Sequence, residues 1–183
     1  MIKGLLKGML MTTLGFAIMA QQGNASPNTK HHMVANSEAN TTDYQGKDWV
    51  LTNLAGEQVR LSQFTQQPVI LVFWATWCPY CKKLLPGMER LHTKYGSSGL
   101  TILAVNIKED WQPKTYWRNH QYSFDALLAG DDVAEIYGVT GTPSVVFIEP
   151  LGKVLKVAQF SDPEHPSLEV FAQHFIKDKK TIN

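Results

Sequence analysis

The sequence predicts an α/β fold in which helices cover both faces of a mixed central sheet, with a β-hairpin at its N-terminal end. Residues 69–74 read Val-Ile-Leu-Val-Phe-Trp, an unbroken apolar run that is typical of a strand buried on both faces. Segments of helical periodicity alternate with further apolar runs, as in a sheet covered by helices. Ala55-Gly56 separates two strand-like segments, residues 49–54 and 57–61, which indicates the hairpin.

The remaining elements follow in order. Apolar residues recur at helical spacing from Cys78 to Tyr95, and Gly96 ends this helix. Pro86 lies inside it and should kink it. Beyond it we expect a strand at 100–106, then two helices with no strand between them at 113–121 and 131–137, then a strand pair at 144–148 and 154–158 and a closing helix at 167–177.

Composition excludes several classes of protein. Hydrophobic residues make up 44% of the 183 residues and charged residues 18%, which fits one globular domain rather than a disordered or polytopic membrane chain. The 17 Lys and Arg nearly balance the 16 Asp and Glu, and no long basic block occurs. We therefore expect no nucleic-acid partner.

The N-terminus has the pattern of a signal peptide. Lys3 and Lys7 precede a short apolar run at residues 8–20, and small residues follow up to Ala25. We expect a cleaved signal at 1–25, with an uncleaved membrane anchor as the alternative, then a polar linker at 26–45, the folded domain at 46–178 and a tail at 179–183. This pattern predicts a periplasmic protein.

The strongest chemical signal is Cys78-Pro79-Tyr80-Cys81, placed where a buried strand leads into a helix. A cysteine at a helix N-terminus faces unpaired N–H groups and the positive end of the helix dipole, and both favour a thiolate. The dipole alone contributes about 0.3 to 1 kcal/mol, so a pKa near 7 also needs hydrogen bonds to the sulfur. Cys78 is the expected nucleophile, and Cys81, one turn later, is the expected resolving residue.

Other uses of the two cysteines are weaker. A zinc site needs two more ligands, and His92 is the one candidate on the same helix. A structural disulfide across so short a loop would stabilise the fold little. A copper chaperone would use Cys78, Cys81 and a histidine, with His31-His32-Met33 as accessory ligands, although that tail alone forms no closed coordination shell. We expect neither a bound metal nor a cofactor.

These residues resemble a known superfamily. The segment 73–81, Phe-Trp-Ala-Thr-Trp-Cys-Pro-Tyr-Cys, looks like the active-site segment of thioredoxin-fold oxidoreductases, and Thr142-Pro143 looks like their cis-proline loop. Together with the signal peptide and the N-terminal hairpin, this is similar to the TlpA, ResA and DsbE group. The resemblance implies a three-layer thioredoxin-like fold and an extracytoplasmic thiol-disulfide oxidoreductase.

The resemblance also implies roles for further residues. Trp77, Pro79, Tyr80, Thr142 and Pro143 would form the client-binding surface around the nucleophile. Cytosolic thioredoxins hold a buried Asp where this chain has Val72, so a proton acceptor for Cys81 must come from elsewhere. Glu109, at the end of the next strand, is the candidate, with a raised pKa and a role as general base; Asp110 is the fallback, and an ordinary solvated loop charge is the alternative.

The expected direction of electron flow is reduction of client disulfides, for example in cytochrome c maturation. The interval between Cys81 and Pro143 leaves little room for the inserted helical domain of a DsbA-like oxidant. A reductase in an oxidising compartment needs electrons from a membrane partner, by resemblance a DsbD-like or CcdA-like protein. A dithiol oxidase that introduces disulfides is the alternative with the same chemistry.

Overall fold

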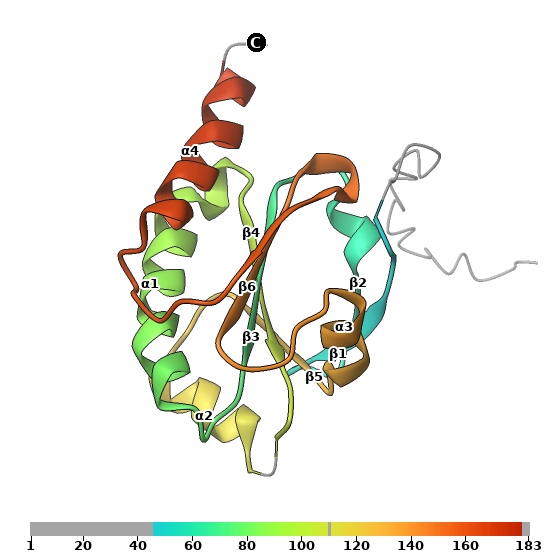
Figure 1. Cartoon of the computed structure of the whole chain (residues 1–183), viewed down its shortest axis with the longest axis vertical. Coiled ribbons are helices and arrows are strands. Elements are labelled where there is room, and N and C mark those ends of the chain that lie inside the picture. The colour runs from blue at the N-terminus through green and yellow to red at the C-terminus, as the bar shows by residue number, and fades with distance from the viewer. Residues whose placement is uncertain (1–45, 110, 181–183) are drawn as a thin grey trace, which may run out of the picture. The chain divides into compact units, whose positions relative to one another are not determined.

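The computed structural model describes residues 46–109 and 111–180, which fold around one mixed sheet (Figure 1). The strands are β1 (Val50–Asn53), β2 (Gln58–Arg60), β3 (Val69–Trp74), β4 (Thr101–Asn106), β5 (Asp125–Leu128), β6 (Ser144–Ile148) and β7 (Val154–Ala158). The helices are α1 (Pro79–Tyr95), α2 (Pro113–His120), α3 (Asp131–Ile136) and α4 (Pro166–Lys180). The strand order is β2-β1-β5-β4-β3-β6-β7, so the expected α/β fold with a mixed central sheet is confirmed.

Strand β3 lies in the interior of this sheet, parallel to β4 and antiparallel to β6. All six of its residues are buried. Because successive side chains point to opposite faces, Ile70, Val72 and Trp74 enter one apolar cluster, and the alternate residues 69, 71 and 73 enter the other. The continuous apolar run in the sequence thus reflects two cores, one on each side of the strand.

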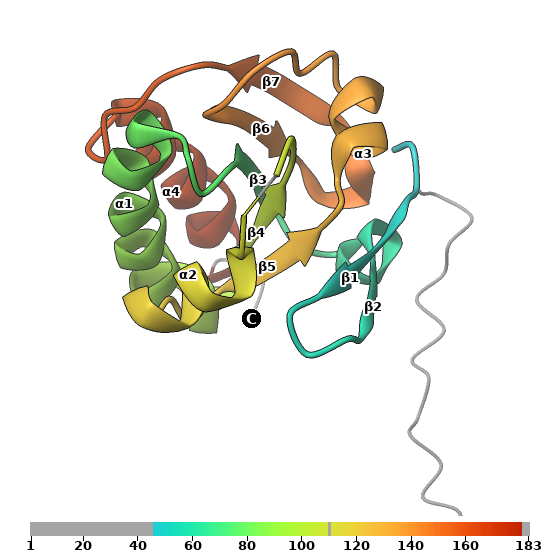
Figure 2. The same ribbon diagram turned by 90° about the horizontal axis from the view of Figure 1, so that it is seen from below.

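The two faces are covered by different helices, as Figure 2 shows: α1, α2 and α4 lie on one side, and α3 lies on the other. Leu84, Leu85 and Met88 of α1 are fully buried against the sheet. Pro86 lies within α1, which runs unbroken from Pro79 to Tyr95. No helix in the described part of the chain is long and apolar enough to cross a membrane.

The absence of a strand between α2 and α3 is a wrong prediction, because β5 lies there. It pairs parallel with β4 and antiparallel with β1. The strand has only four residues and begins with the exposed Asp125, so its sequence shows no alternation of apolar and polar residues. Pairing with neighbouring strands, rather than a local pattern, makes this segment a strand. The predicted signal peptide, linker and extreme C-terminus lie outside the described residues, apart from Lys179 and Lys180 at the end of α4.

Candidate active site

Helix α1 begins directly after Cys78, which is its N-cap residue. The cap is extended, with φ −83° and ψ 110°, and Pro79 occupies the first helical turn, where its missing N–H is not needed. The N–H of Cys81 donates a hydrogen bond to Cys78 Sγ at 3.2 Å. One sulfur therefore receives both a direct donor and the positive end of the helix dipole.

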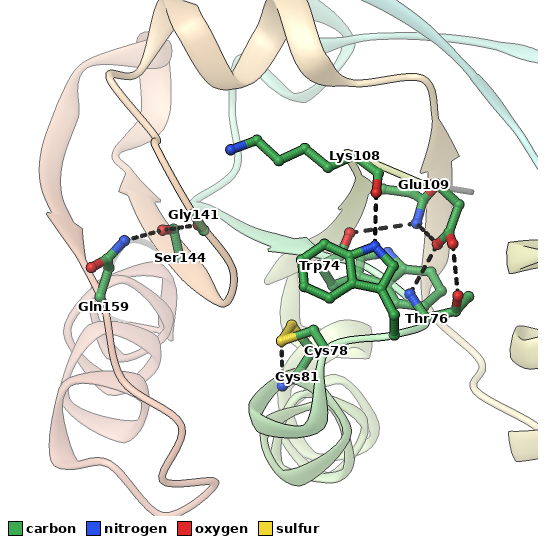
Figure 3. The surroundings of a disulfide bond; sticks show 11 residues. Trp74, Thr76, Cys78, Cys81, Lys108, Glu109, Gly141, Ser144 and Gln159 are labelled. Atoms are coloured by element: carbon green, nitrogen blue, oxygen red, sulfur yellow. Dashed lines mark hydrogen bonds between the residues drawn. A yellow bond between two sulfur atoms is a disulfide. The ribbon is translucent and has the colours of Figure 1, made fainter. Parts of the chain in front are cut away.

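Cys78 and Cys81 form a disulfide across this first turn (Figure 3). Their Cα atoms are 5.3 Å apart, within the range that a disulfide spans without backbone movement. Cys78 is 2% exposed and Cys81 0%, so both cysteines are buried in the disulfide form and Cys78 is marginally the outer one. Trp77, which precedes Cys78 in the chain, is 51% exposed, and Tyr80, which precedes Cys81, is 63% exposed. Each cysteine therefore follows an aromatic side chain that is open to solvent.

The loop that leads into Cys78 is fastened to the end of β4 by one carboxylate. Glu109 accepts hydrogen bonds from the Thr76 N–H at 2.9 Å and from the Thr76 hydroxyl at 2.6 Å (Figure 3). It also accepts from Asn106 Nδ2 at 2.8 Å and from the Trp111 N–H at 3.0 Å. Both oxygens of Glu109 are thus surrounded by donors, and the carboxylate ties residue 76 to the 106–111 loop.

This arrangement changes the expected ionisation of Glu109. Burial raises the pKa of Glu109, but the hydrogen bonds from Thr76, Asn106 and Trp111 outweigh burial and hold the pKa below its ordinary value. The expectation of a raised pKa is therefore wrong. The pKa is lowered because the half-buried carboxylate of Glu109 meets hydrogen-bond donors rather than an apolar wall. No hydrogen bond in the described residues joins Glu109 to Cys78 or Cys81. Asp110, the fallback, lies outside the described residues.

Lys108 links Trp77 to the segment that precedes the proline. Trp77 Nε1 donates to the Lys108 carbonyl at 2.8 Å, which fixes the indole beside the dithiol. Lys108 Nζ donates to the Thr140 carbonyl at 2.7 Å, and the Lys108 N–H donates to Asp131 Oδ1 at 3.0 Å. Three segments that are far apart in the sequence therefore meet at residue 108, which itself has a positive φ of 49°.

The peptide bond between Thr142 and Pro143 is cis. The turn around it is held from the other side by Ser144, whose hydroxyl donates to the Gly141 carbonyl at 2.7 Å and accepts from Gln159 Nε2 at 3.1 Å (Figure 3). A groove of about 400 Å³ joins Tyr80 to Thr142, Pro143 and the start of the β7–α4 connection. No backbone hydrogen bond joins Thr142 to another described residue, and its buried hydroxyl has no partner either.

The structure brings the residues predicted from sequence to one end of α1. Cys78, Pro79, Tyr80 and Cys81 form the helix start, and Thr142 and Pro143 share a groove with Tyr80. Thr76, Asn106, Lys108, Ser144 and Gln159, which hold these segments in place, were not singled out from the sequence. Asn106 offered the one readable signal, because it is a polar residue at the end of a mostly apolar strand; the structure buries it to 2% exposure.

Metal ligands do not gather at this site. In residues 46–109 and 111–180 no three His, Cys, Asp or Glu side chains are placed to hold an ion. His92, the one further ligand considered on α1, packs against Phe124 with ring centroids 6.1 Å apart. The His31-His32-Met33 segment lies outside the described residues.

Comparison with known proteins agrees with the geometry. Residues 42–157 match the model of the AhpC/TSA family. The thiol-disulfide oxidoreductase ResA of Bacillus subtilis is 32% identical over 125 residues, which cover 67% of this chain and 70% of that protein. The ResA of Bacillus thuringiensis subsp. konkukian is 32% identical over 114 residues, 61% of this chain and 66% of its own length.

A solved structure with the same fold is a putative thiol:disulfide interchange protein DsbE from Chlorobium tepidum. It superposes with a TM-score of 0.63 at 29% identity and covers 72% of this chain and 94% of its own. The resemblance that the active-site segment and the proline loop indicated is thereby confirmed. The chain belongs to the AhpC/TSA family, among its thioredoxin-like thiol-disulfide oxidoreductases of the ResA and DsbE type.

Proposed function

We propose that this protein is an extracytoplasmic thiol-disulfide oxidoreductase that reduces disulfides of client proteins through Cys78 and Cys81. The observation that carries the proposal is the disulfide at the N-terminus of α1, with Cys78 as the helix cap and the Cys81 N–H donating to its sulfur. After reduction, the same donor and the helix dipole stabilise a Cys78 thiolate.

The proposed reaction has two exchange steps. The Cys78 thiolate attacks a client disulfide, forms a mixed disulfide and releases one client sulfur as a thiolate. Cys81 then loses its proton and attacks Cys78 Sγ, which restores the Cys78–Cys81 disulfide and releases the second client sulfur. The client gains two electrons and the protein loses two. This order is supported by the place of Cys78 as the helix cap that accepts the Cys81 N–H, and by the absence of exposed surface on Cys81.

Client binding is proposed at the groove between Tyr80 and the cis-proline turn. Thr142 has a backbone that no described residue pairs with, so a client segment could add its own backbone hydrogen bonds there. Pro143 also lines this groove, and Trp77 and Pro79 flank the nucleophile in the chain. We propose that Lys108, Ser144 and Gln159 position the turn, whereas Thr142 and Tyr80 contact the client.

The reducing direction is supported by the modest stabilisation of the Cys78 sulfur. A strong oxidant such as DsbA has a strongly stabilised reduced form, whereas here one N–H and the helix dipole act on Cys78 Sγ among the described groups. The interval from Cys81 to Pro143 holds β4, α2, β5 and α3, which leaves no inserted helical domain. We propose apocytochrome c or another cysteine-containing assembly client, and a DsbD-like or CcdA-like membrane protein as the electron donor.

The proposed location is the periplasm, reached by the signal-like residues 1–25, with anchorage by that segment as the alternative. It would explain the need for an outside source of electrons, because an oxidising compartment does not keep a dithiol reduced.

The redox potential of the Cys78–Cys81 pair tests the direction. We expect a value between about −270 and about −200 mV, the range from thioredoxin to the glutaredoxins. Equilibration of the protein with glutathione or dithiothreitol buffers, read by the thiol content of the trapped protein, gives this number. A potential near the −120 mV of DsbA, roughly 100 mV higher, would reverse the assignment and make the protein a dithiol oxidase.

A further inference from the structure

A second groove lies on the other side of Cys78, between the start of α1 and helix α2. Its volume is about 420 Å³, and its walls include Trp77, Lys82, Trp111 and Tyr116. We refer to it as the α1–α2 groove. Trp77 is 51% exposed and Trp111 77%, so two large aromatic surfaces face solvent at its rim. Side chains of this kind are enriched where proteins bind partners.

Lys82 lines the α1–α2 groove, and three further cations, Lys83, Lys114 and Arg118, are chain neighbours of lining residues. Lys82 and Lys83 are exposed on the first turns of α1, and Lys114 and Arg118 are exposed on α2. Residues 79–88 and 113–120 contain no Asp or Glu. In the described part of the chain, none of these four cations is ion-paired with a carboxylate.

The charged groups at the groove also favour a negatively charged ligand. Lys82 Nζ lies 5.9 Å from the centre of the Tyr116 ring, so its charge is directed over the aromatic wall. Glu109 accepts hydrogen bonds from Thr76 and Trp111, which both line the groove, so one negative charge lies against its wall. Lys82 and its three neighbouring cations outnumber this one carboxylate, so the net charge of these five groups is positive and favours an acidic ligand.

We propose that the α1–α2 groove is a docking surface for an acidic segment of the client, one that carries an apolar or aromatic side chain next to Asp or Glu. The inference rests on the proposed disulfide exchange and names the class of client sequence that this site takes. Trp77 and Tyr80, the neighbours of the reactive turn, line different grooves. A client can therefore place one segment on the cis-proline turn and an acidic segment against α2, with its sulfur between them. Rim charges act chiefly on the association rate, which makes the effect salt-dependent.

The test uses three synthetic peptides of equal length, each with one cysteine held as a mixed disulfide with glutathione. The cysteine is followed by Asp-Phe-Asp, Ser-Phe-Ser or Lys-Phe-Lys. The rate constant for reduction by the reduced full chain is measured at low and high salt. At low salt we expect the Asp peptide to react about tenfold faster than the Lys peptide. The preference should fall below about twofold near 1 M salt, where the Debye length is about 3 Å.

Charge reversal locates the effect. Lys82→Glu with Lys114→Glu should abolish or invert the preference for the Asp peptide. The matched control, Lys47→Glu with Lys156→Glu, changes the net charge by the same amount at two exposed positions that do not line the groove, and it should keep the preference. Equal rates for the three peptides, or a preference that the control loses as much as the double variant, would overturn the docking surface and leave the exchange chemistry standing. If the protein reduces none of the peptides, the proposed function itself fails.

Discussion

The Cys81→Ala protein is expected to accumulate mixed disulfides with its clients, whereas Cys78→Ala is expected to form none. The reason is the geometry of the first turn of α1. Cys78 caps the helix and its sulfur accepts the Cys81 N–H, so we expect Cys78 to attack the client and Cys81, which has no exposed surface, to release it. Cells that express each variant would be acid-quenched and alkylated, and the adducts identified by non-reducing gels and mass spectrometry.

The two variants are matched controls for each other. Each removes one sulfur, and circular dichroism checks that both variants fold. Adducts of equal yield on both variants would contradict the assignment of roles. Adducts on Cys78→Ala alone would exchange the nucleophile and the resolving residue.

Glu109→Gln is expected to lower the free energy of unfolding by about 2 kcal/mol at pH 7, the scale of one charge-assisted hydrogen bond replaced by an unsatisfied pair. Oε2 of Glu109 faces the Thr76 N–H and Oε1 faces the Trp111 N–H. Whichever way the amide is turned, its NH₂ group meets a backbone donor. Urea unfolding of the wild type and the variant measures the difference.

The difference should depend on pH in a defined direction. Hydrogen bonds hold the pKa of Glu109 in the folded protein below its ordinary value, although burial alone would raise it. A carboxylate with a lowered folded pKa contributes its full stability above the unfolded value, about 4.3, and loses it as the pH falls through the folded value. The gap between wild type and Glu109→Gln should therefore be constant from about pH 6 to 8 and shrink below about pH 4.

Glu135→Gln provides the control, because Glu135 is an exposed carboxylate of α3 and its loss changes the net charge equally. If Glu109→Gln and this control have the same free energy of unfolding at pH 7, the hydrogen bonds to the Glu109 carboxylate do not stabilise the fold. The role of Glu109 as proton acceptor for Cys81 stays a prediction that the same variant tests. A general base contributes about 10² to 10⁴-fold, so closure of the disulfide at the wild-type rate would end that role.

The sequence predicted those parts of the site that short, continuous patterns specify. The apolar run of β3, the helical spacing of α1 and the Cys-x-x-Cys pair at their junction are all local, and the structure has β3 at the predicted residues 69–74. Pro79 at the start of α1 is a signal of the same local kind.

What the sequence missed depends on contacts between distant segments. Strand β5 forms because β4 and β1 pair with it on either side. The direction of the Glu109 pKa was wrong because donors from Thr76, which lies 33 positions earlier, cannot be read from the residues around 109. The link from Lys108 to Thr140 likewise joins two loops that only the sheet brings together.

The most direct test of the account is the rate at which iodoacetamide alkylates Cys78 in the Cys81→Ala protein as a function of pH. This variant leaves one thiol and retains the backbone N–H of residue 81, which lies 3.2 Å from the Cys78 sulfur. The account predicts an apparent pKa near or below about 7, against about 8.5 for a free cysteine. A pKa at or above about 8.5 would contradict it, because a thiol that is not ionised near neutral pH gains nothing from its place at the helix N-terminus.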